Sequence, residues 1–258
     1  MEPMAGRSCL GGPAPASEYP AGVPRLASVW DQSRRTGLRT ITSVGEYHGE
    51  PTIAVAATQL ALSYTRTQAT KIVDEWVRFF SAGPSPITEL HFVTRTPKRL
   101  FASLAGQSQL RRLFVKWGDY DDLSVLSGMD QIEALRLGGA SSVRSVEPIV
   151  DLRATLTHLE IESVRHVHDL TPLGRLDGLT QLDVGGNWMS PRIAHIDSIA
   201  WLPDLQKLEH LLLHTIIVDE LDYTPLLHLK GLKAVRVMQA RGMRPPIADL
   251  KSQLPWSE

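Results

Sequence analysis

The chain has 258 residues, of which 43% are hydrophobic and 21% are charged, and this is enough apolar material for a sizeable globular core. Its 27 Lys and Arg residues stand against 28 Asp and Glu residues, so it lacks the basic surplus that binding to nucleic acid or to an anionic membrane requires. The single cysteine, Cys9, excludes an internal disulfide framework and a cysteine-based zinc site.

The sequence also predicts where the protein resides. No apolar run approaches the ~20 residues of a membrane span. The first 26 residues lack the continuous apolar stretch of a secretory signal. We therefore expect a cytoplasmic protein that binds no membrane.

The first two regions of the chain differ sharply in composition. Residues 1–36 are rich in Gly, Pro, Ala and Ser, so they bury too little surface to offset the entropy of ordering and are predicted to be a flexible tail. Residues 37–86 are predicted to be an N-terminal capping segment. Short apolar runs over 40–61 predict a small hairpin, or a strand and a turn.

An amphipathic helix is predicted over residues 68–81 of the capping segment. Thr67 can cap its start, and the "AGPSP" that follows carries the Gly and Pro of a helix stop. Large apolar side chains recur there at helical spacing; they are Ile72, Val73, Trp76, Val77 and Phe80.

From Ile87 onward the sequence is a repeat of the form L-x-x-L-x-L. All 21 of its framework positions are apolar, and such a period marks a stacked architecture. The seven segments are "ITELHFVTR", "LRRLFVKWG", "IEALRLGGA", "LTHLEIESV", "LTQLDVGGN", "LEHLLLHTI" and "LKAVRVMQA". They start at Ile87, Leu110, Ile132, Leu156, Leu179, Leu208 and Leu232.

This pattern resembles the leucine-rich repeat family, in particular its short bacterial form, in which "L-x-x-L-x-L" is followed by "L-x-P-L-x-x-L". The stretch "DLTPLGRLDGLTQLDVGGN" carries the resemblance most specifically. The family usually places Asn at the ninth position of the repeat, where its side chain bonds the turn. Here only Asn187 occupies that position, so the turns are expected to be less regular.

The resemblance implies an α/β fold, a leucine-rich-repeat solenoid. Residues 87–240 would form about seven strands of a curved parallel sheet on the concave face, with short helices or 3-10 turns on the convex face. Because side chains alternate along a strand, the fourth and sixth positions point into the core. The third, fifth and seventh positions then point onto the concave face.

Two further elements complete the predicted solenoid. The longest repeat contains "SPRIAHIDSIAWL", read as an inserted helix that Ser190 caps and Pro191 begins, with Ile193, Ile196 and Ile199 facing the core. Residues 241–258 are predicted to be a C-terminal cap with a short helix from Pro246 and Trp256 as a covering residue.

The candidate site is the concave face, where charges fall into basic and acidic sectors. Phe114, Trp117 and Leu212 would be apolar anchors, because exposed aromatic and Arg residues dominate binding energy at interfaces. Alternatively, the charges only pair with one another across neighbouring strands. The candidate residues are His91, Arg112, Phe114, Lys116, Trp117, Arg136, His158, Glu160, Glu162, Asp183, His210, Leu212, His214 and Arg236. Trp188 and Met189 form a second candidate, a rim loop.

No metal or cofactor is expected. His210 and His214 lie four residues apart on a predicted strand, so their Cα atoms are roughly 13 Å apart at about 3.3 Å per residue. That is too far for two imidazoles to share one zinc. The motifs "RHVHD" and "GDYDD" lack the ligand number of a zinc site and the spacing of a calcium loop.

The sequence therefore predicts a non-catalytic module that binds a partner protein on its concave face, as an adaptor, an inhibitor or an immunity factor. No nucleophile elbow, phosphate loop or zinc-protease motif is present in the sequence. Two alternatives remain open. The chain could be an enzyme-associated or regulatory subunit with a site in residues 40–81, or a scaffold that associates with itself.

Overall fold

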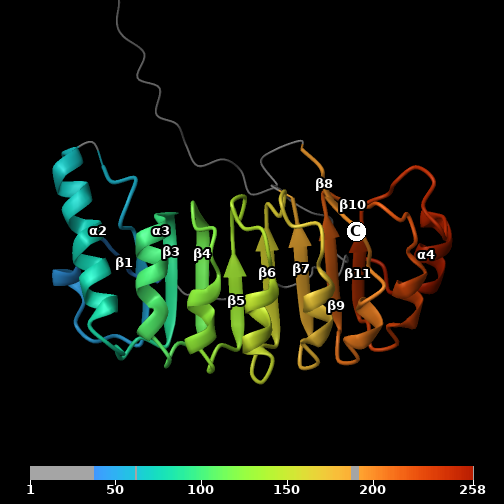
Figure 1. The fold of residues 1–258 in the computed structure, drawn as a ribbon, viewed down its shortest axis with the longest axis horizontal. Coiled ribbons are helices and arrows are strands. Elements are labelled where there is room, and N and C mark those ends of the chain that lie inside the picture. Colours follow the sequence, from blue (N-terminus) through green and yellow to red (C-terminus); the bar gives the residue numbers. More distant parts are fainter. Residues whose placement is uncertain (1–37, 62, 187–191, 258) are drawn as a thin grey trace, which may run out of the picture.

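A parallel sheet of nine strands runs the length of the molecule, in the order β1-β2-β3-β4-β5-β6-β7-β9-β11 (Figure 1). The computed structural model describes residues 38–61, 63–186 and 192–257. The strands of this sheet are β1 Thr40–Ile41, β2 Thr52–Val55, β3 Glu89–Thr96, β4 Arg112–Gly118, β5 Ala134–Leu137, β6 His158–Glu162, β7 Gln181–Gly185, β9 His210–His214 and β11 Ala234–Val237.

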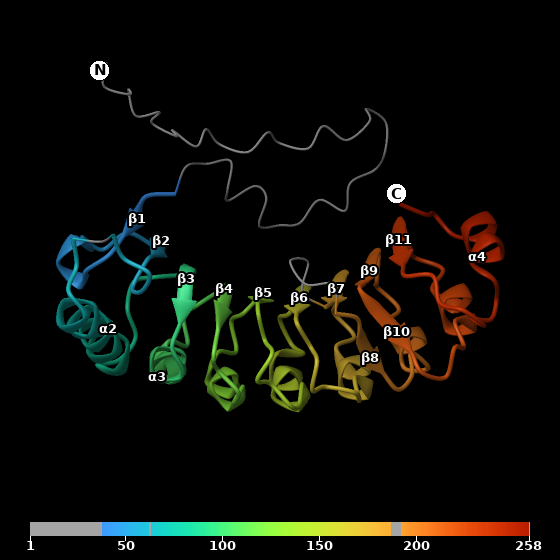
Figure 2. The ribbon, with the colours of Figure 1, turned by 90° about the horizontal axis from the view of Figure 1, so that it is seen from above.

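The sheet curves, with its strands on the inner side of the arc and the helical segments on the outer side (Figure 2). No described helix has the length and apolarity needed to cross a bilayer. The helices are α2 Arg66–Ser81, α3 Lys98–Ala102 and α4 Ile247–Gln253, and the 3-10 segments are η1 Val44–Glu46, η2 Ser103–Gly106, η3 Ser124–Gly128, η4 Glu147–Leu152, η5 Thr171–Arg175, η6 Leu202–Asp204 and η7 Thr224–His228.

One backbone contact recurs at every junction from β2 to β11. The carbonyl oxygen of the residue directly before the first paired position accepts hydrogen bonds from two consecutive N–H groups at the start of the next strand, at 2.7 to 3.2 Å. This contact fixes each strand in register with its neighbour, third position beside third position. The accepting residues are Pro51, Thr88, Arg111, Glu133, Thr157, Thr180 and Glu209.

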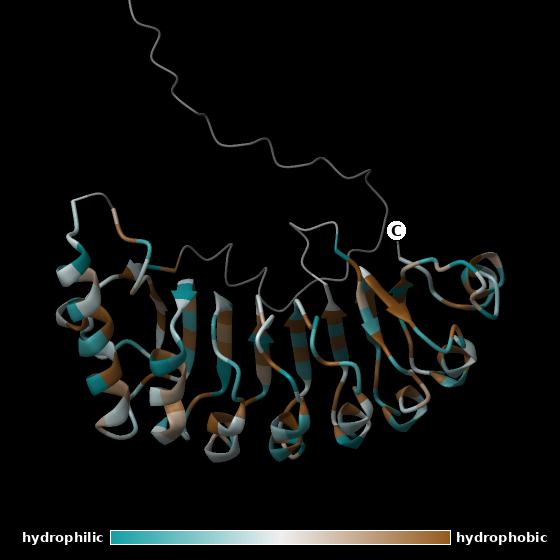
Figure 3. Cartoon of the chain, turned by 45° about the horizontal axis from the view of Figure 1, so that its top comes forward, coloured by the Kyte–Doolittle hydropathy of each residue, from teal (hydrophilic) through white to brown (hydrophobic). Residues whose placement is uncertain are grey.

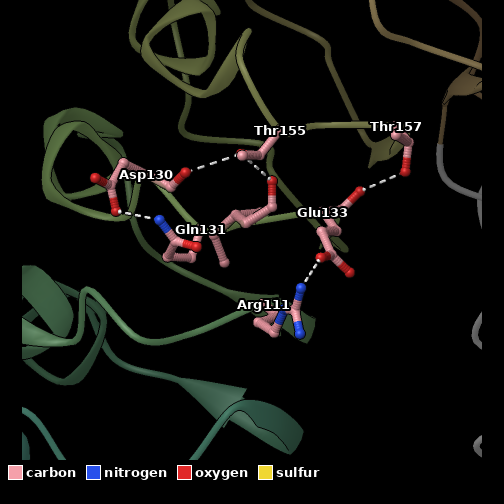
Figure 4. Close-up of polar contacts among 7 residues, drawn as sticks. Arg111, Asp130, Gln131, Glu133, Thr155 and Thr157 are labelled. Carbon is pink, nitrogen blue, oxygen red and sulfur yellow. Dashed lines mark hydrogen bonds and ion pairs between the residues drawn. The ribbon is translucent and has the colours of Figure 1, made fainter.

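Polar side chains also join neighbouring repeats near the starts of the strands (Figure 4). The Thr157 hydroxyl donates to the Glu133 carbonyl at 3.0 Å, and the Thr155 hydroxyl donates to the Asp130 carbonyl at 3.0 Å. The guanidinium of Arg111 pairs with the Glu133 carboxylate at 2.5 Å. Neighbouring repeats are therefore joined by side chains as well as by the strand ladder.

The interior is a continuous apolar core. Twenty of the 21 framework side chains are buried, and Leu232 is only partly so. In β6, Leu159 and Ile161 lie in this core, whereas His158 and Glu162 on alternate positions are partly exposed. Figure 3 shows the same alternation of hydrophobic and hydrophilic residues along the strands. The inward and outward positions predicted from the repeat are thus observed.

Short polar side chains stabilise the turns that lead into the 3-10 segments. At the start of η3, η5 and η7, an Asp carboxylate accepts the N–H of the residue two positions on, at 2.8 to 3.0 Å. Serine hydroxyls accept an N–H at the start of η4 and two residues before η6, at 3.2 and 3.1 Å. These acceptors, Asp122, Asp169, Asp222, Ser145 and Ser198, form a periodic feature that the sequence analysis missed.

The predicted inserted helix after β7 is wrong. Ala194–Ile196 forms strand β8, which pairs in parallel with β10, Ile216–Val218, in a separate two-stranded sheet. Burial along β8 alternates, with His195 exposed between two buried residues, which is the period of a strand and not of a helix. Ile196 and Ile199 are buried as expected, but Ile193 is 45% exposed. Ser190 and Pro191 lie outside the described residues.

At the N-terminal end, β1 and β2 extend the sheet as parallel strands and do not form a hairpin. Helix α2 begins earlier than predicted, because Thr65 and not Thr67 caps it. The Thr65 hydroxyl accepts the N–H of Gln68 at 3.2 Å, and the Gln68 side chain accepts the N–H of Thr65 at 2.8 Å. This reciprocal pair is a capping box.

Helix α2 closes the N-terminal end of the core with aromatic side chains. Trp76 is fully buried, and its indole N–H donates to the Thr42 carbonyl at 2.7 Å. Its ring stacks on Phe80, and Phe80 meets Phe92 of β3 edge to face, with centroids 6.1 Å apart. The first repeat is therefore covered by packed rings.

The other end of the sheet is covered by the chain after α4. The N–H of Val235 donates to the Pro255 carbonyl at 2.9 Å, and the N–H of Ser257 donates to the Val235 carbonyl at 3.0 Å. The last strand thus has backbone partners on both sides, which protects an edge that would otherwise template aggregation. The division into a cap at 37–86, repeats at 87–240 and a cap at 241–258 remains a prediction.

We predict that Trp76→Ala lowers the free energy of unfolding by about 3–5 kcal/mol, because it removes a fully buried indole and leaves a cavity. Trp76→Phe should cost only about 1–2 kcal/mol, because it keeps most of the ring packing and loses the bond to the Thr42 carbonyl. Urea unfolding followed by circular dichroism would measure both. Equal losses for the two variants would contradict the proposed role of ring packing.

Candidate functional site

The strands carry the predicted concave-face residues along the inner side of the arc. Leu211 and Leu213 of β9 are buried in the core, so His210 and His214 on alternate positions face the other side of the sheet. The same register places third-position residues side by side from β3 to β11. Trp188 and Met189 of the predicted rim loop lie outside the described residues.

The first part of the site joins β3 to β4. The imidazole Nε2 of His91 lies 2.7 Å from the Glu89 carboxylate, and one guanidinium nitrogen of Arg112 lies 3.7 Å from the same carboxylate. The His91 ring stacks on Phe114, with centroids 5.2 Å apart and 27° between the planes. His91 therefore contacts both the Glu89 carboxylate and the Phe114 ring.

The three predicted apolar anchors differ in exposure. Phe114 is only 5% exposed, because its ring packs between His91 and the Arg136 guanidinium, whose central carbon lies 5.0 Å from the ring centroid. Trp117 is 37% exposed at the end of β4, and Leu212 is partly exposed on β9. Of the three, Trp117 offers the largest accessible apolar surface.

Arg136 of β5 is the centre of the site. Its guanidinium lies 3.0 Å from the Glu160 carboxylate and 2.6 Å from the Glu162 carboxylate, both on the neighbouring strand β6. The side chain of Arg136 is 14% exposed. One cation is thus shared by two carboxylates in a largely desolvated position.

The environment of Glu160 favours its protonated form. Burial raises the pKa of Glu160 to about 8, an effect that the nearby Arg136 charge opposes and that the Asp183 and Glu162 charges reinforce. Burial also lowers the pKa of His158, helped by the charges of Arg112 and His210. The middle of the concave face therefore carries less charge than its residue types suggest.

A glycine makes room for the next contact along the face. The Nε2 atom of His214 on β9 lies 3.3 Å from the Asp183 carboxylate on β7. A side chain at Gly185, the last residue of β7 and the seventh position of its repeat, would place its Cβ only 2.0 Å from the same imidazole nitrogen. Gly185 was absent from the predicted site. The signal for it is a glycine beside a histidine at the same repeat position of adjacent strands.

The motifs "GDYDD" and "RHVHD", considered as metal sites, lie close together beyond the C-terminal ends of β4 and β6 but do not form a metal site. Asp121, Asp122 and His166 line a shared hollow of about 530 Å³ together with Lys98. Lys98 pairs with Asp121 at 2.7 Å, and Asp122 accepts the N–H of Ser124 in its turn. Within the described part of the chain, no group of three or more His, Cys, Asp or Glu side chains is placed to hold a metal ion.

The raised pKa of Glu160 predicts a specific pH dependence of stability. The folded protein binds a proton at Glu160 that the unfolded chain, with its ordinary value of 4.5, releases. The contribution of Glu160 to the free energy of unfolding therefore falls as the pH rises from about 4.5 towards 8. Glu160→Gln cannot ionise, so it should lose this part of the pH dependence.

Urea unfolding of the wild type and of Glu160→Gln at about pH 6 and about pH 9 would measure the effect. The wild type should lose more stability between the two conditions than the variant. Glu133→Gln is a matched control, because Glu133 directly precedes strand β5 and its side chain is 39% exposed. If the free energy of unfolding changed equally with pH in the wild type and in Glu160→Gln, Glu160 would not be the protonated group.

Comparisons with known proteins return structural neighbours only. No family model matches the chain, and no curated protein matches it either. A search of solved structures finds an internalin of Listeria monocytogenes that is 20% identical, with a TM-score of 0.48, over 66% of this chain and 47% of that protein. The chain thus spans about half the length of this neighbour.

Two further neighbours have a similar degree of likeness. Internalin C2 of Listeria monocytogenes is 20% identical with a TM-score of 0.35, over 64% of this chain and 92% of that one. The leucine-rich-repeat ectodomain of the receptor kinase GASSHO1/SCHENGEN3 from Arabidopsis thaliana is 15% identical with a TM-score of 0.36, over 59% of this chain and 21% of that one.

The assignment of the fold depends on the geometry of the chain itself. Seven strands repeat in register along 87–240, their L-x-x-L-x-L side chains share one apolar core, and short helical segments return the chain along the outer side. The chain therefore has the fold of a leucine-rich-repeat solenoid.

Proposed function

We propose that the chain is a non-catalytic protein-binding module that receives a partner protein on its concave face. The observation that carries the proposal is the line of contacts from Glu89 through His91, Phe114 and Arg136 to Glu160. These contacts hold polar and aromatic side chains in fixed positions on the inner side of the arc. A preorganised surface loses less conformational entropy when a partner binds.

The charges at the edge of this line favour binding over simple self-pairing. Arg136 contacts the carboxyl groups of both Glu160 and Glu162, so the centre of the face is internally paired. Lys116 is exposed beside the exposed Trp117 at the end of the same strand, β4. An accessible Trp is among the residue types that most often carry the binding energy of a protein interface, and Lys116 adds a positive charge beside it. We propose that these two residues make direct contact with the partner.

The N-terminal segment supports the role of a cap better than that of a separate site. Its large aromatic residues, Trp76 and Phe80, are used in packing against the first repeat. This observation favours the module over an enzyme-associated subunit with a site in residues 40–81. An adaptor, an inhibitor and an immunity factor all require the same surface, and identification of the partner would distinguish these roles.

The proposal predicts that Lys116→Glu and Trp117→Ala each weaken the partner complex at least about tenfold, which corresponds to about 1.4 kcal/mol. Both side chains are exposed, so the fold should tolerate the changes. The partner would be isolated with the wild-type chain, identified by mass spectrometry and titrated in purified form by calorimetry.

Arg153→Glu is the matched control, because Arg153 is exposed on the outer side just after η4. It makes the same kind of charge change as Lys116→Glu but should leave the affinity unaltered. Undiminished affinity in both concave variants, or an equal loss in Arg153→Glu, would refute binding on the concave face.

A further inference from the structure

A cavity of about 520 Å³ lies at the C-terminal end of the sheet, between the ends of β9 and β11 and helix α4. This volume is within the range of pockets that bury small ligands, roughly 300–1,000 Å³. The residues that define its chemistry are Arg236, Met238, Gln239, Ile247, Lys251 and Trp256.

Among the residues that the structure describes, the cavity is lined by cations and by no carboxylate. Arg236 projects from β11 and Lys251 from α4, and both are exposed. Neither forms an ion pair with any residue that the structure describes. Directly before the same two strands the opposite holds, since Lys233 pairs with Glu209 at 2.8 Å. Two cations facing one cavity, with no counter-charge among the described residues that line it, attract an anionic group.

The walls between the two cations are apolar and aromatic. The ammonium group of Lys251 lies 5.5 Å from the centre of the Trp256 ring. Met238 and Ile247 are partly exposed and line the same cavity. A ligand that fills it should therefore carry an apolar side chain next to its negative charge.

We infer that this cavity binds an acidic, hydrophobic peptide segment, in which an Asp or Glu side chain lies next to a large apolar one. Arg236 and Lys251 would hold the carboxylate, since a guanidinium matches carboxylate geometry with two parallel bonds. Trp256 and Met238 would contact the apolar neighbour. The inference rests on the proposed function, because the segment would belong to the partner protein.

The test needs no partner protein. The full chain, labelled with ¹³C at its methionine methyl groups, would be titrated with the peptide acetyl-Glu-Leu-Glu-Phe-amide. The methyl signal of Met238 should shift and saturate, while that of Met129, fully buried in the core, should not move. Acetyl-Gln-Leu-Gln-Phe-amide, which has the same shape without charge, should bind at least about fivefold more weakly.

Single substitutions test whether Arg236 and Lys251 hold the peptide. Arg236→Gln and Lys251→Gln should each weaken binding of the acidic peptide at least about fivefold, with unchanged urea unfolding midpoints. Lys230→Gln is the matched control, because Lys230 is exposed after η7 and does not line the cavity. It should leave the peptide affinity as in the wild type.

Three results would overturn the inference. A Met238 signal that does not move would show that no peptide enters the cavity, and equal affinity for the two peptides would show an apolar groove without anion recognition. Sodium acetate or inorganic phosphate binding as tightly as the peptide would show a site for small anions only. If the peptide fails to bind while Lys116→Glu still weakens the partner complex, the cavity assignment falls and the proposed function stands.

Discussion

The structure depends on one backbone contact, in which a carbonyl at the start of each repeat accepts two N–H groups from the next repeat. No single repeat can bury its own framework side chains, so each repeat gains its core only from its neighbours. The contact sets the register in which they stack. A shift of one residue would turn Leu159 and Ile161 outward and Glu160 inward. The columns of side chains on the concave face are therefore a direct consequence of this register.

The strongest features of the fold could be predicted from the sequence because they are periodic. The framework of apolar residues predicted the seven strands of 87–240 and the side to which each residue points, including the strand that carries His210 and His214. The segment around Ala194 was misread, because a short apolar run with isoleucines at every third residue also fits a helix. Its strand, β8, exists only with β10 as partner, and that pairing brings together segments about one repeat apart.

The candidate site could be predicted only in outline. Repeat position identified the residues on the concave face, but their environment depends on contacts between strands. Phe114 was expected to be an exposed anchor, yet His91 and Arg136 from the flanking strands cover its ring. The pKa of Glu160 likewise follows from burial and from Asp183 on the next strand. The Asp and Ser side chains that begin the 3-10 segments were overlooked because the family pattern directed attention to Asn.

The distribution of charge along the arc follows from how the strands share their partners. In the middle, Arg136 faces two carboxylates of β6, and the desolvation of Glu160 favours a proton over a second negative charge. At the C-terminal end, β11 has no further repeat beside it. Arg236 therefore has a neighbouring strand on one side only, and the residue paired with it there is the uncharged Leu212. The last strand of a solenoid thus presents charges that an inner strand would neutralise, and α4 with Trp256 turns this open end into a cavity. The same termination of the stack that requires a cap to protect the core also leaves a hollow into which Arg236 and Lys251 bring two positive charges.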